Sequence, residues 1–308
     1  MQAHPSKSIF THPLWVAIFA LTAAVAWGWA YPLIKLGFEE FQIHAEMTGS
    51  KMLFAGIRFF FSGFILLILA KITKRDFHIK EKKNSYTFLL LFTLLNTTLH
   101  YAFFYIGLSH SDGARAAILN SLSVFTLVLL ACAVFPSDKL TPRKIFGCIL
   151  GFLGILMLNW GSIDAFTFTP LGDGMIILNA LCSAFASLMT RGVSKRIDIF
   201  VGTGYSLAIG GALLIIPGLF MNGTLPQITW TGILILILLI GISTIGFALF
   251  NKLLSCNPIG KVAIFNSLIP AVGAVTSCWC LREPFYMNYI LSIVLLSGGI
   301  YIINKGKE

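Results

Sequence analysis

Hydrophobic residues fall in long segments along the chain, and short stretches rich in polar residues, Gly and Pro separate them. Each segment is long enough to cross a bilayer, since a transmembrane helix needs about 20 residues. Turn-forming pairs such as Asn222-Gly223 and Asn257-Pro258 mark the junctions. The pattern predicts ten transmembrane helices. They lie within residues 14–36, 52–70, 86–107, 113–134, 143–160, 171–190, 200–220, 229–250, 259–280 and 285–303.

Composition supports this pattern, because 57% of the 308 residues are hydrophobic and 11% are charged. Soluble proteins carry roughly a quarter charged residues. Ten helices would use about 200 residues, which leaves no room for a separate soluble domain. The predicted fold class is an all-α polytopic membrane protein. The first segment is expected to stay as a helix, because it is too long for a signal peptide and lacks a small-residue cleavage site.

Positive charges lie mainly on one side of the predicted membrane. With the N-terminus inside, alternate loops place 17 of the 22 Lys and Arg residues on the inner side. Cytoplasmic loops carry such an excess, so both termini are expected in the cytoplasm and the chain in the cell (inner) membrane, with the lipid bilayer as its partner. Topology thus accounts for the formal net charge of +10. No nucleic-acid partner is expected, because no basic stretch is interleaved with base-stacking aromatic residues.

The sequence contains an internal repeat. The tripeptide Asn120-Ser121-Leu122 recurs as Asn266-Ser267-Leu268, and Gly154 corresponds to Gly299. Five predicted helices therefore occur twice. Because five is odd, the second copy enters the membrane from the opposite side, which predicts inverted-topology repeats. The predicted organisation is a cytoplasmic tail at 1–13, a first repeat at 14–160 and a second repeat at 171–304.

Short motifs at characteristic places point to a known family. They are Ala26-Trp27-Gly28, Arg58, Ser267-Leu268-Ile269-Pro270, Arg282-Glu283-Pro284 and Gly298-Gly299. With them the chain resembles the EamA-type branch of the drug/metabolite transporter superfamily over residues 14–304. The resemblance implies ten helices in two five-helix repeats, and import or export of amino acids, nucleosides, organic acids or drugs. The first repeat departs from the pattern with Val124 in place of Pro270 and Asp138 in place of glutamate, so strict symmetry is not expected.

Motifs of intramembrane catalysis are missing from the sequence. It has no His-Glu-x-x-His motif, no paired aspartates and no P-loop. The six cysteines lie in or beside apolar segments without metal-site spacing, and we interpret them as buried apolar residues. We therefore expect neither an enzyme nor a cofactor or metal site. The alternative, a non-transporting structural or signalling membrane protein, gives no reason for polar stripes within the helices.

Polar stripes of this kind occur in helices one and six. Trp27 and Tyr31 are four residues apart and share one face of helix one. Their counterparts in helix six are Ser183 and Ser187, with Asn179 one turn earlier. Polar groups are costly in hydrocarbon unless they face protein or water. Two facing stripes therefore predict a lined cavity.

Further polar residues lie inside the apolar segments of helices three, four and nine. His100 and Tyr101 are assigned to the cavity, whereas Asn120 and Asn266 fit either the cavity or hydrogen bonds between packed helices. The favoured function is a secondary transporter of a small metabolite, an amino acid or an organic anion, by alternating access. The predicted substrate-binding residues are Trp27, Tyr31, Arg58, His100, Tyr101, Asn120, Asn179, Ser183 and Asn266.

Arg58 requires a partner, because it lies about 9 Å inside helix two at 1.5 Å per residue. A cation at helix centre costs about 2.5–3.5 kcal/mol on insertion scales. The partner is either a helix-end carbonyl or Asp112, or Arg58 attracts an anionic metabolite to an outer vestibule. All twelve acidic residues fall in loops, tails or helix ends, which leaves His100 as the candidate proton site. Among the acidic residues, Asp138 and Glu283 are interpreted as solvated helix-end charges.

Glycines and prolines predict where helices pack closely or break. Gly147 and Gly151 form a small-residue face on helix five, and Gly299 is the counterpart on helix ten, so these helices are expected to be scaffold. Pro32 and Pro270 lie well inside helices one and nine. There, proline removes a backbone hydrogen bond and either kinks the helix or frees carbonyl groups for a binding site.

The charge pattern leads to a test of topology in a background without native cysteines. A cysteine in the 71–85 loop should be shielded from an impermeant thiol reagent in intact cells, because this loop holds many of the inner positive charges. A cysteine in the loop around Gly223 should react. The reverse labelling pattern would contradict the cytoplasmic placement of the termini.

Overall fold

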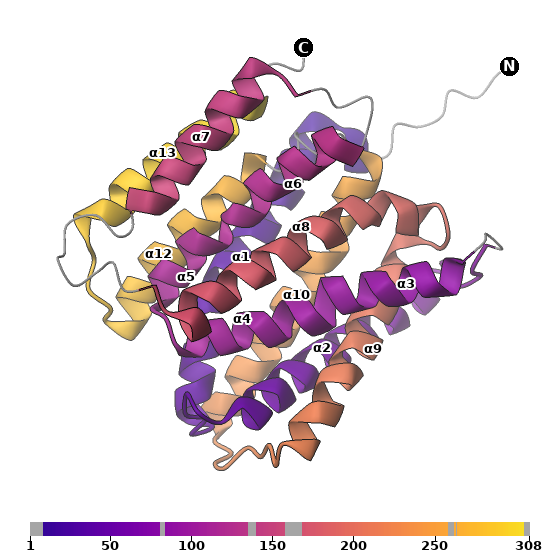
Figure 1. Cartoon of the computed structure of the whole chain (residues 1–308). Coiled ribbons are helices and arrows are strands. Elements are labelled where there is room, and N and C mark those ends of the chain that lie inside the picture. Colours follow the sequence, from indigo (N-terminus) through magenta and orange to yellow (C-terminus); the bar gives the residue numbers. More distant parts are fainter. Residues whose placement is uncertain are drawn as a thin grey trace, which may run out of the picture.

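The computed structural model describes residues 9–80, 84–134, 140–157, 168–257, 262 and 264–304. Over these residues the chain is built from helices, and none of them forms a strand (Figure 1). This confirms the predicted all-helical class. The helices run in a closely packed bundle in which segments from the two halves of the chain alternate (Figure 1).

The first half of the chain begins with a short 3-10 turn, η1 (Ile9–Thr11). It continues with α1 (Pro13–Glu40), α2 (Thr48–Ile72), α3 (Ser85–Thr93), the π-helical turn η2 (Leu94–Thr98), α4 (Leu99–Ser109), α5 (Gly113–Asn120), α6 (Leu122–Val134) and α7 (Pro142–Met157). The segments α3, η2 and α4 are continuous and together form the predicted third helix.

The second half begins with the π-helical turn η3 (Pro170–Gly174), which leads directly into α8 (Met175–Ser194). It continues with α9 (Ile199–Phe220), α10 (Trp230–Cys256), the 3-10 turn η4 (Ile264–Ser267), α12 (Leu268–Leu281) and α13 (Met287–Asn304). Each of the ten predicted apolar segments therefore overlaps helix, although Ser121, Thr229, Phe285 and Tyr286 within them are not helical.

Seven helical stretches are long and apolar enough to cross a membrane. They are Pro13–Glu40, Thr48–Ile72, Ser85–Ser109, Gly113–Val134, Pro170–Ser194, Ile199–Phe220 and Trp230–Cys256. The segments α12 and α13 are shorter apolar helices in the described part of the chain. The protein is thus a multi-pass membrane protein, while the count of ten spans and the inverted relation of the two halves stay predictions.

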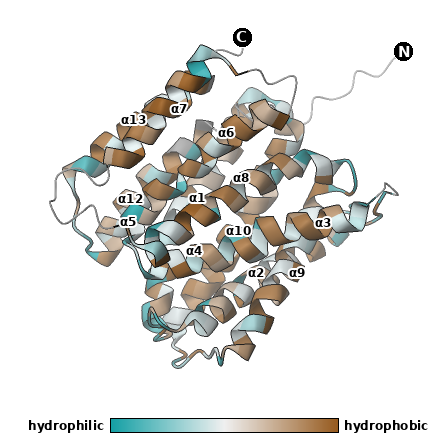
Figure 2. Ribbon diagram, in the orientation of Figure 1, coloured by the Kyte–Doolittle hydropathy of each residue, from teal (hydrophilic) through white to brown (hydrophobic). Residues whose placement is uncertain are grey.

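The outer surface of the bundle is apolar, as expected for helices in contact with lipid. Large hydrophobic side chains such as Phe61, Phe64 and Ile68 of α2 are exposed. Hydrophobic residues run along the helices, and hydrophilic residues gather at their ends and in the connections (Figure 2). A soluble monomer rarely exposes such extensive apolar patches, so lipid is the medium that fits this surface.

Helices α7 and α13 form a tight pair at one edge of the bundle (Figure 1). A Cβ atom added to Gly147 would lie 2.6 Å from the carbonyl oxygen of Gly299. The ring of Phe125 occupies the space where a side chain at position 151 would stand. The predicted small-residue face between helices five and ten is therefore confirmed.

A second tight pair, which the sequence analysis did not identify, joins α2 and α9 at the opposite edge (Figure 1). Glycines repeat every seven residues on both helices and face the partner backbone. They are Gly49, Gly56 and Gly63 on α2, and Gly204, Gly211 and Gly218 on α9. Since the two helices belong to different halves of the chain, this contact ties the halves together.

Both copies of the Asn-Ser-Leu motif lie where the helical geometry changes. The segment α5 ends at Asn120 and α6 begins at Leu122, while the 3-10 turn η4 ends at Ser267 and α12 begins at Leu268. Pro270 lies in the first turn of α12, the part of a helix that tolerates proline. Pro32 is buried inside α1, which stays helical on both sides of it, so the chain is not unwound there.

The glycine contact between α2 and α9 leads to a test of stability. In Gly63→Ala, the new methyl group would overlap the backbone nitrogen of Ala208, so a helix backbone must shift. Overpacking of this kind costs about 1–3 kcal/mol, and we expect a lower thermal unfolding temperature in detergent. Gly241→Ala is the matched control, because nothing lies within 4 Å of the added Cβ. Equal unfolding temperatures for both variants would contradict the close contact.

Candidate functional site

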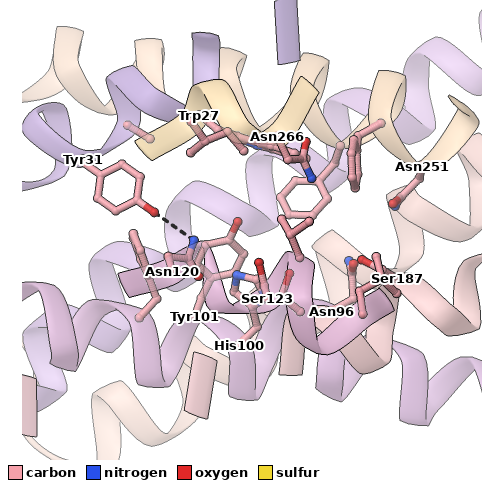
Figure 3. A pocket seen from close by; sticks show the side chains of 18 of the residues that line it. Trp27, Tyr31, Asn96, His100, Tyr101, Asn120, Ser123, Ser187, Asn251 and Asn266 are labelled. Atoms are coloured by element: carbon pink, nitrogen blue, oxygen red, sulfur yellow. Dashed lines mark hydrogen bonds between the residues drawn. The ribbon is translucent and has the colours of Figure 1, made fainter. Parts of the chain in front are cut away.

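A cavity of about 100 Å³ lies between the two halves of the chain (Figure 3). Residues of α1, α2, η2, α4, α5 and α6 line it from the first half, and residues of α8, α10, η4 and α12 line it from the second. Its polar or amphipathic lining residues are Trp27, Tyr31, Arg58, Asn96, His100, Tyr101, Asn120, Ser123, Ser183, Ser187, Asn251 and Asn266. None of its described lining residues belongs to α7 or α13.

The structure brings together eight of the nine predicted site residues and leaves out Asn179. Asn179 is fully buried behind the cavity wall and donates a 2.7 Å hydrogen bond from Nδ2 to Oδ1 of Asn120. Asn120 in turn donates from Nδ2 to the hydroxyl oxygen of Tyr31 at 2.9 Å. The assignment of Asn179 to the lining is therefore wrong, because Asn120 lies between Asn179 and Tyr31.

The two interpretations of Asn120 both hold. Its side chain connects α1 with α8 through hydrogen bonds, and it also lines the cavity. Figure 3 shows Tyr31 and Asn120 meeting at one end of the cavity, with Ser187 and Asn251 toward the other end. The Tyr31–Asn120 contact thus forms one end wall.

Trp27 is held by aromatic neighbours on α10. Its ring packs edge-on against Phe247 and Phe250, with centroids 5.4 Å and 5.0 Å apart. Gly246 makes room for the indole, since an added Cβ would lie 2.7 Å from Nε1. The helical spacing of Trp27 and Tyr31 on α1 therefore does place both on the cavity face, as the sequence pattern predicted.

Seven lining residues with polar groups make no hydrogen bond from their side chains to any other described residue. They are Trp27, His100, Tyr101, Ser123, Ser183, Ser187 and Asn266. Polar groups in hydrocarbon need a partner in protein or water. Because these groups converge on one cavity (Figure 3), water or a polar ligand is the partner that remains for them.

Asn96 and Asn251 line the same cavity but are fixed by hydrogen bonds to α9. Asn96 donates to the hydroxyl of Ser206 at 3.0 Å, and Asn251 donates to the hydroxyl of Thr203 at 3.1 Å. Asn96 lies in the π-helical turn η2, a feature common at functional sites. These two amides contribute preorganised polar groups to the wall.

Four polar lining residues are absent from the predicted substrate-binding set: Asn96, Ser123, Ser187 and Asn251. Ser187 belongs to the polar stripe predicted on helix six, and Asn96 and Ser123 each lie three or four residues from a predicted site residue in the same predicted helix. Asn251 lies outside the predicted eighth segment, which ends at residue 250, whereas α10 continues to Cys256.

Arg58 is 1% exposed and lies in the cavity wall. Its Nε donates to the hydroxyl of Ser243 at 2.8 Å and to the carbonyl oxygen of Leu239 at 3.2 Å. Its Nη1 donates to the hydroxyl oxygen of Tyr105 at 2.9 Å. A mid-helix carbonyl and two hydroxyl groups therefore replace the expected helix-end carbonyl or Asp112.

Ion pairs join the two halves beyond the Tyr31–Asn120 end of the cavity. Lys35 lies one turn beyond Tyr31 on α1, and its Nζ is 2.9 Å from Oε1 of Glu283. The Glu283 carboxylate also accepts hydrogen bonds from the backbone N–H groups of Gly113 and Ala114, at 2.9 Å and 3.1 Å. An anion is favourable at a helix N-terminus, so Glu283 fastens α1 and the start of α5 to the end of α12.

The interpretation of Glu283 as a solvated end charge is therefore wrong, because its side chain is only 9% exposed and fully engaged. Local sequence suggested Arg282 as its neighbour, whereas the fold brings Lys35 to it. Asp138, which received the same interpretation, lies outside the described residues.

A second ion pair at the same end joins Arg115 of α5 to Asp173 of η3. Arg115 donates from Nε and Nη2 to the two carboxylate oxygens of the buried Asp173, at 2.8 Å and 2.9 Å. Both Lys35 and Arg115 also line a polar hollow on the far side of the Tyr31–Asn120 contact. The bundle is thus closed between this hollow and the central cavity.

The described residues contain no group of three or more His, Cys, Asp or Glu side chains that could hold a metal ion. The site is instead a polar cavity inside a membrane bundle. This arrangement can bind and enclose a small polar molecule.

Comparisons with known proteins agree with this geometry. The model of the EamA-like transporter family matches the chain twice, over residues 14–160 and 170–305. The uncharacterized transporter YvbV of Bacillus subtilis is 26% identical, over 95% of this chain and 92% of its own. An uncharacterized transporter of Methanothermobacter thermautotrophicus is 25% identical, over 98% and 90%. A crystal structure with 15% sequence identity shares the fold, with a TM-score of 0.70 over 93% of this chain and 95% of that one.

The ion pair of Glu283 leads to a test of the closed end. Glu283→Gln removes the charge that pairs with Lys35 and caps α5, and hydrogen bonds to charged groups are worth about 1.5–3 kcal/mol. A reporter cysteine at cavity residue Ser123 should then react several-fold faster with an impermeant thiol reagent added outside cells, the side that this end faces in the predicted topology.

The matched control for this experiment is Asp112→Asn. It removes one negative charge at the same end, but its side chain is exposed and makes no hydrogen bond or ion pair with the described residues. The labelling rate should stay unchanged in this variant. Equal acceleration by both substitutions would show that charge density, and not the Glu283 contact, controls closure.

Proposed function

Since the chain belongs to the EamA-like transporter family, we propose that it is a secondary transporter of a small polar metabolite. The substrate binds in the central cavity, and the two halves of the chain rock around it to expose the cavity to either side of the cell membrane in turn. Amino acids and organic anions are the favoured classes of substrate.

One observation carries this proposal. The cavity has unpaired polar groups from both halves, and it is closed at one end by polar contacts that each join the first half to the second. These contacts are Lys35–Glu283, Arg115–Asp173 and Asn120–Asn179. Among the described residues, single hydroxyl groups such as those of Ser277 and Ser292 are also unpaired in packed helices, but the convergence of several unpaired polar groups from both halves on one cavity favours a binding site.

The two-fold match of the family model supports two related halves. The helical geometry changes at both Asn-Ser-Leu motifs, and their asparagines Asn120 and Asn266 both line the cavity. Broken helices at the interface of inverted repeats are a common design of transporter sites. In this proposal both termini are cytoplasmic, so the closed end faces outward.

Coupling in this proposal does not use a carboxylate in the cavity, because its lining contains none among the described residues. His100 is the candidate proton site among the lining side chains, because an imidazole titrates near neutral pH in ordinary surroundings. Since no described lining carboxylate can carry protons, the transport mode proposed is facilitated diffusion or exchange.

Flux measurements in liposomes test the transporter proposal. Purified protein is reconstituted, and a mixed metabolite library is followed by mass spectrometry on both sides with pH and voltage clamped. We expect at least one metabolite to cross faster than in protein-free vesicles. Ser183→Trp, which places a large ring in the cavity wall, should reduce that flux at least about tenfold.

The control variant for the flux measurement is Phe185→Trp, on the same helix. Phe185 is exposed on the outer surface of the bundle, so flux should persist. No flux above the protein-free level for any compound would reject the transporter proposal and favour a structural or signalling protein. Equal flux in both tryptophan variants would reject the central cavity as the path.

A further inference from the structure

The central cavity carries one formal charge. Arg58 is the only Lys, Arg, Asp or Glu among its described lining residues. No carboxylate of the described residues lies within ion-pair distance of Arg58, although Lys35, Arg75 and Arg115 all have one. The protein therefore surrounds this cation with neutral groups in a medium where an unpaired charge is costly.

The guanidinium of Arg58 retains unused donors. It has five N–H groups, and the hydrogen bonds from Nε and Nη1 go to Ser243, Leu239 and Tyr105. No described residue accepts a hydrogen bond from Nη2. The other bonds fix the plane of the guanidinium, so an empty donor edge is held in position at the cavity.

A carboxylate satisfies this edge better than other groups. Because the single N–H of Nε is already donated to Ser243 and Leu239, a carboxylate binds through Nη2 and the remaining N–H of Nη1, by charge-assisted hydrogen bonds about twice as strong as bonds between neutral groups. One carboxylate also cancels one guanidinium charge, so the occupied cavity is neutral. A dianion would leave a negative charge, and a cation would add to the positive one.

The remainder of the cavity fits the rest of such a molecule. Ile34, Phe104, Leu127 and Phe247 provide apolar wall for a short carbon skeleton. The described lining residues offer hydroxyl, amide and imidazole groups but no carboxylate for an ammonium group. A volume of about 100 Å³ admits only a small molecule.

We propose that the substrate class is a small organic monocarboxylate without an amino group, bound through its carboxylate to Arg58. This inference rests on the proposed transport function and deepens it. It selects organic anions over amino acids because the described lining has no carboxylate for an ammonium group, and it assigns Arg58 as the residue that binds the substrate carboxylate.

The test uses pyruvate and pyruvamide as probes, because they have nearly the same shape and differ in charge. Thermal unfolding of the purified full-length protein is measured with each probe and with L-alanine at constant ionic strength. A ligand that binds only the folded state raises its stability in proportion to RT ln(1 + [L]/Kd). We expect stabilisation by pyruvate at concentrations at least about tenfold lower than by pyruvamide or L-alanine.

Arg58→Gln should abolish the preference for pyruvate over pyruvamide. The matched control is Lys71→Gln, which removes one positive charge from an exposed position on the same helix and should keep the preference. Equal stabilisation by pyruvate and pyruvamide in the unchanged protein would overturn the proposal, as would a preference that survives in Arg58→Gln.

A second variant serves if Arg58→Gln does not fold. Ser183→Asp leaves Arg58 and its hydrogen bonds intact but adds a negative charge to the cavity wall, so pyruvate should lose its advantage over pyruvamide. Persistence of the pyruvate preference in Ser183→Asp would overturn the proposal.

Two further controls, one with potassium chloride and one with a series of monocarboxylates, distinguish binding of a carboxylate from binding of any anion. Stabilisation by added potassium chloride equal to that by pyruvate would show a general anion site and overturn the carboxylate class. If no two- to six-carbon monocarboxylate stabilises the protein, the substrate-class proposal also fails.

The liposome experiment keeps this result separate from the transport proposal. Flux of a neutral or zwitterionic metabolite that Ser183→Trp blocks would leave the transporter proposal intact while rejecting the monocarboxylate. Absence of all flux would reject both.

Discussion

The absence of hydrogen-bonding partners in hydrocarbon is the constraint on which this structure depends. Every polar side chain inside the bundle needs a partner in the protein, in water or in a ligand. Asn96 and Asn251 find hydroxyl groups of α9. His100, Ser183 and Asn266 find no described partner and converge on the cavity. The polar side chains of the cavity wall therefore fall into two groups, those that neighbouring helices fix by hydrogen bonds and those that are left to water or a ligand.

The same bundle contains two kinds of contact between its halves. At the edges, α2 with α9 and α7 with α13 pack backbone against backbone over glycines. At the closed end near the centre, ion pairs and hydrogen bonds connect the halves. Dispersion contacts over glycines are lost as soon as helices separate, whereas polar groups can exchange their partners for water. In alternating access, the central polar contacts are thus the ones suited to break while the edge pairs persist.

How far the sequence predicts this molecule depends on how local the deciding information is. Segment length and hydropathy located the helices, and spacing on one helix placed Trp27, Tyr31 and Ser183 on a common cavity. The small-residue face of Gly147 was likewise readable from spacing. Partners that come from distant segments were not readable. Glu283 meets Lys35 248 positions away, and Arg58 meets Ser243 185 positions away.

Asn179 and Pro32 show why local information ends there. Asn179 lies one turn from Ser183 and on a similar face, yet one turn is enough to pass beyond the end wall formed by Tyr31 and Asn120. Pro32 lies deep in α1, yet the helix continues through it. The placement of Asn179 and the conformation at Pro32 depend on the neighbouring helices. The residue spacing within a single helix does not predict where those neighbours lie.

The partners of the buried cations link the fold to the proposed substrate. Lys35 and Arg115 are paired with carboxylates at the closed end, whereas the buried Lys51 and Arg58 donate hydrogen bonds to neutral acceptors. Among the described residues, Arg58 is the one of these four cations that lines the central cavity. If its counter-ion is the substrate, the empty cavity is charged and the loaded cavity is neutral. A charged cavity is the harder one to move through a low-dielectric bundle, so the loaded protein changes conformation more readily than the empty one, and exchange of anions is faster than net flux.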